Sequence, residues 1–105
     1  MNIVTQGIIT VVVGEQATIP CYSSNTGRVV WSRVNDSALG GRDEVLTVDG
    51  TVTTEFIGRV SIHITESGDQ NLLISNVTLD DARLYRCATA KDGTEHHVVL
   101  QVIQG

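Results

Sequence analysis

Aromatic residues and proline are scarce in this sequence. Its 105 residues include one tryptophan, two tyrosines, one phenylalanine and one proline, although 41% of the residues are hydrophobic. A core must therefore be built mainly from valine, isoleucine and leucine. The length leaves room for one such core, so we expect residues 1–105 to form a single domain.

Long apolar runs and an excess of basic residues are also absent. The longest largely apolar stretch, Ile8 to Val13, is far shorter than the ~20 residues that span a bilayer, so we expect no membrane insertion by this segment. The first residues are partly polar and lack a basic start, unlike a signal peptide, and we expect any leader to have been removed. The formal net charge of −5 argues against nucleic-acid binding.

Signatures of catalysis and metal binding are missing as well. We find no Ser–His–Asp arrangement with a supporting motif and no glycine-rich phosphate loop, and therefore expect no enzyme activity, no catalytic residue and no cofactor. His96 and His97 are adjacent in a predicted strand and point to opposite faces, while His63 lies on another strand. We therefore expect no metal site.

Short β-rich runs separated by turn residues indicate an all-β protein. Gly7 would allow the chain to switch between two sheets, and Asp49-Gly50 is a strong hairpin signal. Pro20 removes a backbone donor and would leave a bulge or an unpaired backbone group. We expect strands at residues 3–5, 8–13, 16–22, 28–34, 44–48, 51–56, 59–65, 70–76, 83–90 and 96–103.

A three-point frame, Cys21, Trp31 and Cys87, is joined to a motif that ends at the second cysteine. The motif has the pattern L-x-I-x-x-V-x-x-x-D-x-x-x-Y-x-C and starts at Leu72. Frame and motif resemble the variable-type (V-set) domains of the immunoglobulin superfamily over essentially the whole chain. The resemblance implies an immunoglobulin V-type β-sandwich with one inter-sheet disulfide, Cys21–Cys87, packed against Trp31.

The resemblance also assigns structural roles near the second cysteine. Tyr85 matches the tyrosine corner, whose hydroxyl bonds to nearby backbone, and Asp81 would accept a hydrogen bond from Arg59 at the base of the sandwich. Arg83 stands where glycine or alanine is common in the family, and we expect it to point to solvent.

Two departures from the family pattern limit which kind of V-set domain the sequence resembles. Antigen-receptor domains carry an F/W-G-x-G motif at the start of the last strand, but Glu95, His96 and His97 stand in that region here. The final hairpin loop, about residues 91–94, is also short. Both departures favour a germline-fixed domain over a rearranged antigen-receptor chain.

The alternation that turns Trp31 and Cys87 inward defines an opposite, outward set of residues. Most side chains of this set are small or apolar, and they surround a single arginine, whereas a solvated face would be mostly polar. A neighbouring domain of the same polypeptide could cover such a face, and a one-residue register error would reverse it. We expect partner binding by Val30, Ser32, Val34, Arg86, Ala88, Ala90, Val99 and Gln101, with Ile103 and His97 on the same side.

We therefore expect a recognition domain, membrane-distal in a longer ectodomain of a cell-surface adhesion molecule or immune-type receptor, or secreted. Its partner would be a protein on another cell, or a second copy in a homodimer. Two alternatives stay open: an innate immune receptor domain for a non-self or glycan ligand, and an antigen-receptor-like chain that needs a partner V domain. Asn35 and Asn76 begin N-glycosylation sequons.

Overall fold

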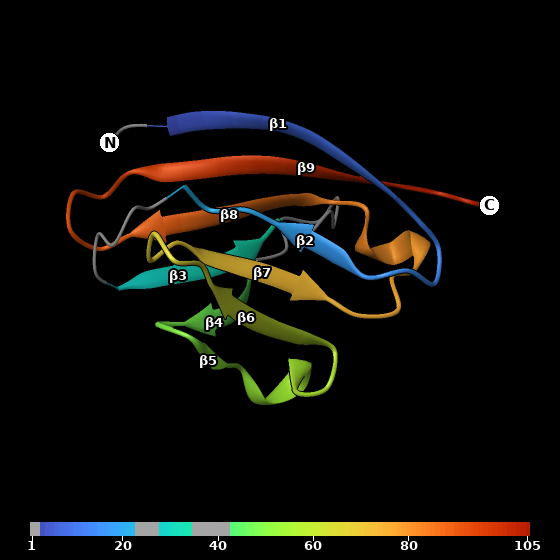
Figure 1. The fold of residues 1–105 in the computed structure, drawn as a ribbon, viewed down its shortest axis with the longest axis horizontal. Coiled ribbons are helices and arrows are strands. Elements are labelled where there is room, and N and C mark those ends of the chain that lie inside the picture. The colour runs from blue at the N-terminus through green and yellow to red at the C-terminus, as the bar shows by residue number, and fades with distance from the viewer. Residues whose placement is uncertain (1–2, 23–27, 35–42) are drawn as a thin grey trace.

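A computed structural model describes residues 3–22, 28–34 and 43–105 as two packed β-sheets (Figure 1). The large sheet has the strand order β1 (Ile3–Val12), β9 (Glu95–Ile103), β8 (Leu84–Thr89), β3 (Val29–Arg33), β4 (Glu44–Val48) and β5 (Thr51–Val52). The small sheet has the order β2 (Ala17–Ile19), β7 (Gln70–Ile74) and β6 (Val60–Ile64). Two short 3-10 turns, η1 (Thr54–Phe56) and η2 (Leu79–Asp81), complete the described elements. The predicted all-β sandwich is confirmed.

The core lies between the two sheets and follows the predicted alternation. Cys21 and Cys87 form the disulfide, and both residues are fully buried, as is Trp31. The indole nitrogen of Trp31 donates to the Gln70 carbonyl at 2.9 Å, which satisfies its single polar group. Valine, isoleucine and leucine supply most of the remaining core: Ile19, Val29, Leu46, Leu72, Ile74, Val77, Val98 and Leu100.

The first strand does not switch between sheets, so that prediction was wrong. β1 runs parallel to β9 over its whole length, and Gly7, with φ at +108°, accommodates a bulge between Thr5 and Gly7. The Gln6 side chain makes the link to the other layer instead. Its Nε2 donates to the Pro20 carbonyl at 2.6 Å, and its Oε1 accepts from the Tyr22 N–H at 3.2 Å.

The predicted strand over residues 51–56 was also too long. The chain turns at Asp49 and Gly50, which both have positive φ, and pairs with β4 through Thr51 and Val52. It then enters η1, and Phe56 packs against the core. Where the chain leaves the sheet, the only phenylalanine thus becomes partly buried against the core.

The β8–β9 hairpin is closed by a side-chain network that predicts a pH effect. The Thr89 hydroxyl donates to Asp92 at 2.7 Å and the Thr94 N–H donates to it at 3.0 Å, which lowers the pKa of Asp92 from 3.8 to about 2. A pKa below that of the unfolded chain stabilises the fold above about pH 4, and this stabilisation is lost as the pH falls toward 2.

An NMR titration of the Asp92 carboxyl group is the direct measurement. We expect its midpoint near 2 in the wild type and nearer 3.8 in Thr89→Val, which removes the first donor and keeps the side-chain shape. Thr65→Val, at the β6–β7 turn, serves as the matched control and should leave Asp92 unchanged. A wild-type midpoint close to 3.8 would contradict the prediction.

Candidate functional site

In five strands of the large sheet, β1, β9, β8, β3 and β4, alternate residues point away from the core. We call the surface that these residues form the outer face. The register places Val30 beside Ala88, and Ser32 beside Arg86, while Arg86 also pairs with His97 on β9. Most residues of the predicted binding set lie on this face: Val30, Ser32, Arg86, Ala88, Val99 and Gln101. Val34 follows β3 directly and is half-buried, and exposed Ala90 lies just beyond the end of β8.

Strands that sequence reasoning left out extend the apolar part of the outer face. Ile8 of β1 pairs with Val99, and it is 68% exposed. On β4 a register shift next to Trp31 buries both Leu46 and Thr47 and turns Val45 and Val48 outward. Simple alternation could not find this pattern, because the bulge breaks the period of two.

Exposed and half-buried apolar side chains therefore form two continuous rows across the outer face. One row follows the register through Ile8, Val99 and Leu84, and Val34 adjoins it through a hydrogen bond to the Leu84 carbonyl. The other row joins β8, β3 and β4 through Ala88, Val30 and Val48.

A charged cluster centres on the Arg86–His97 pair between the two apolar rows, and Glu95 of this cluster lies beside Ala88 in the register. Arg86 forms an ion pair with Asp43 and approaches Glu95 to 4.0 Å, while His97 contacts Glu95 at 2.9 Å. The side chains of Arg86, Glu95 and His97 are only about a fifth to a quarter exposed. Arg86 is therefore held in place by its neighbours within this cluster.

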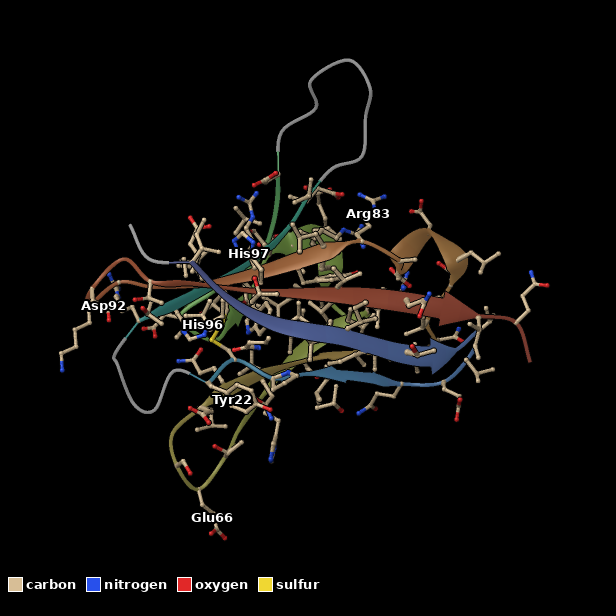
Figure 2. All side chains as sticks on the ribbon, turned by 90° about the horizontal axis from the view of Figure 1, so that it is seen from above. Tyr22, Glu66, Arg83, Asp92, His96 and His97 are labelled. Atoms are coloured by element: carbon tan, nitrogen blue, oxygen red, sulfur yellow. A yellow bond between two sulfur atoms is a disulfide. The ribbon has the colours of Figure 1, made fainter. Side chains whose placement is uncertain are left out.

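The two adjacent histidines lie on opposite sides of β9, as Figure 2 shows. His96 is 8% exposed and faces the core, next to Cys87 in the register, whereas His97 belongs to the outer face. Within the described ranges, no group of three or more histidine, cysteine, aspartate or glutamate residues could hold a metal ion.

An ion-pair network lies at one end of the core and has a structural role. Asp81 accepts from Arg59 at 2.9 Å, as expected, and also from Arg33 at 3.2 Å. The Thr78 N–H donates to the same carboxylate at 2.8 Å, and the Tyr85 hydroxyl donates to the Asp81 carbonyl at 2.7 Å. Asp81 thereby connects β3, the start of β6, η2 and β8.

The pKa values of Tyr85 and Arg33 in this network are both raised, for different reasons. Burial raises the pKa of Tyr85, and its interaction with Arg33 offsets only part of the rise. Burial alone would lower the pKa of Arg33, but interactions with Tyr85 and Glu44 outweigh it and raise the pKa. Both shifts keep Arg33 charged and Tyr85 neutral across the physiological pH range.

Arg83 does not point to solvent, so that prediction was wrong. Its guanidinium bonds to Glu44 at 2.7 Å and to Asp80 at 3.2 Å, and its side chain is only 15% exposed (Figure 2). Glu44 also pairs with Arg33, so Arg83 extends the Asp81 network to the surface. The Arg83 side chain therefore reaches across the end of the sheet, from just before β8 to Glu44 on β4.

The glycosylation sequons stay predictions. Asn35 lies outside the described residues. Asn76 is exposed and adopts a φ of +51° two residues after the end of β7, a turn conformation that asparagine tolerates. The following residue, Val77, is buried in the core, whereas Asn76 itself is exposed.

Comparison with known proteins adds one finding. Residues 4–103 match the family model for the immunoglobulin V-set domain. The search of curated proteins returned no match. Among the described residues, no helix is long and apolar enough to cross a membrane.

Proposed function

Since this chain belongs to the immunoglobulin V-set family, we propose that it is the recognition module of a cell-surface receptor or adhesion molecule. Domains of this family are typically extracellular, commonly mediate protein–protein interaction, and are generally not enzymes. In the proposal, the outer face binds a protein partner on another cell or a second copy of the chain. The domain would be the membrane-distal part of a longer ectodomain.

The observation that carries this proposal is the apolar character of the outer face. A solvated sheet face normally carries mostly polar side chains. Here Ile8, Val45, Val48 and Val99 are each more than 40% exposed, and further apolar side chains lie between them. Contiguous exposed apolar surface rimmed by polar groups is typical of protein-interaction sites.

The charged cluster would supply orientation and selectivity within that face. Counting Asp43, Glu95 and Arg86 as charged and His97 as neutral, the cluster carries a net charge of −1. A partner that places a cation opposite the cluster would be favoured, and one that places a carboxylate there would be repelled. The apolar rows on either side would exclude water from this contact.

Val99→Lys is the variant that tests the proposal. Val99 is 41% exposed, and its register partners, Ile8 and Leu84, lie outside the buried core, so the fold should tolerate lysine. We expect at least about a tenfold loss of affinity for any protein bound by the outer face, because a lysine would be desolvated in the apolar row.

The measurement is binding of the multimerised domain to a panel of purified receptor ectodomains, with this domain itself in the panel and a glycan array in parallel. Ile64→Lys is the matched control, since Ile64 is a 62% exposed residue on β6 of the small sheet. Hits that retain full affinity for Val99→Lys would contradict the proposal. Hits on glycans alone would favour lectin-type recognition instead.

A further inference from the structure

β1 is the edge strand at one side of the large sheet, and Figure 1 shows it as the outermost strand. Nine of its ten residues pair with β9 on one side, Gln6 being the bulged residue, and no described strand pairs with its other side. Every second residue of an edge strand directs its N–H and C=O away from the sheet, which provides a template for another strand. The opposite edge, β5, has only two residues.

Three of the usual protections of an edge strand are missing from β1. Proteins blunt such edges with charged side chains, with proline, by keeping the edge strand short or with a β-bulge, and of these β1 has the bulge at Gln6. Residues 3–12 contain neither a charged residue nor a proline, and the strand is ten residues long. Ile3, Val4 and Ile8 are 58%, 43% and 68% exposed.

The sequence of β1 is complementary to itself when read in the opposite direction. The bulge at Gln6 keeps Ile3 and Thr5 on the same side of the sheet as Thr10 and Val12, since all four lie opposite outer-face residues of β9. An antiparallel copy can therefore place Ile3 opposite Val12 and Thr5 opposite Thr10 with matching faces. Val4 then faces Val11, so that apolar residues meet apolar ones and threonine meets threonine.

From this register we propose that a second copy of the chain binds along β1, antiparallel and related by a two-fold axis perpendicular to the sheet. Charge favours a second copy at this position. Two copies that each carry −5 repel over most of their surfaces, but they meet at β1 without a charge on either strand. Assembly stops at the dimer, because the interface uses the long free edge of both copies. The outer face stays open to another partner.

The proposed register can be tested by a charge swap. One variant carries Thr5→Lys and Thr10→Lys, and the other carries Thr5→Glu and Thr10→Glu; both positions are exposed. In sedimentation velocity we expect the wild type to dimerise with rising concentration. Each variant alone should dimerise at least about tenfold more weakly, because like charges lie directly opposite one another. An equimolar mixture should dimerise again, because lysine then meets glutamate.

A matched control carries Thr18→Lys and Ser61→Lys, two exposed positions on the small sheet, and should dimerise like the wild type. A wild type that is monomeric at about 1 mM would overturn the inference. Variants that dimerise like the wild type, or a mixture that does not recover, would also overturn it. A dimer lost in Val99→Lys but kept in the β1 variants would place self-association on the outer face, which supports the proposed function and refutes pairing through β1.

Discussion

Replacing Asp81 by alanine is expected to lower the free energy of unfolding by about 3–5 kcal/mol, the usual cost of breaking a buried ion pair from one side. The Asp81 side chain is 5% exposed, and it accepts hydrogen bonds from Arg33, Arg59 and the Thr78 N–H. Removing it leaves the Arg33 guanidinium, only 11% exposed, with Glu44 as its remaining carboxylate partner. Urea denaturation followed by tryptophan fluorescence measures the change.

Substitutions of two more exposed charged residues near Asp81 show whether burial, rather than charge alone, determines the loss of stability. Arg59 is 45% exposed, so Arg59→Ala should cost no more than about 1 kcal/mol despite its bond to Asp81. Asp80 is 81% exposed, and Asp80→Ala should change stability by about 0.5 kcal/mol or less. If Asp81→Ala costs no more than Asp80→Ala, the network does not stabilise the fold in the way its geometry indicates.

The same network shows how far sequence reasoning reaches. Arg59 and Asp81 were paired because both stand at motif positions of the family that the sequence resembles. Arg33 was missed, although alternation from Trp31 already placed it on the inward side. An arginine at an inward position is normally excluded by the cost of burying its charge. Only the three-dimensional arrangement shows that Asp81 and Glu44 converge on it and that Phe56 lies under its guanidinium at 5.2 Å.

For the outer face as well, alternation predicts some of the outward residues and misses others. Strands β3, β8 and β9 keep a strict period of two, so their outward residues follow from Trp31 and Cys87. β4 and β1 contain register shifts, which are set by pairing with neighbouring strands rather than by local sequence. The contributions of Val45, Val48 and Ile8 therefore became visible only in the structure. The self-complementary edge of β1 depends on its own bulge, at Gln6.

Removing the disulfide is expected to cost about 4 kcal/mol of unfolding free energy, from the entropy of closing a long loop in the unfolded chain. Cys21 and Cys87 are separated by 66 positions, and both are fully buried beside the core. The double variant Cys21→Ala, Cys87→Ala avoids a free thiol, and urea denaturation compares it with the oxidised wild type. A loss below about 1 kcal/mol would contradict this prediction.

The mechanism of that loss can be tested in the same experiment. If the bridge acts by restricting the unfolded chain, its removal should raise the dependence of unfolding free energy on urea, because the unfolded state becomes more expanded. The folded double variant should keep Trp31 buried, with an unchanged emission maximum. Small domains have a total stability of about 5–15 kcal/mol. Combining the double variant with Asp81→Ala should lower the free energy of unfolding by about 7–9 kcal/mol, which exceeds the total stability at the lower end of that range, and urea denaturation measures the loss.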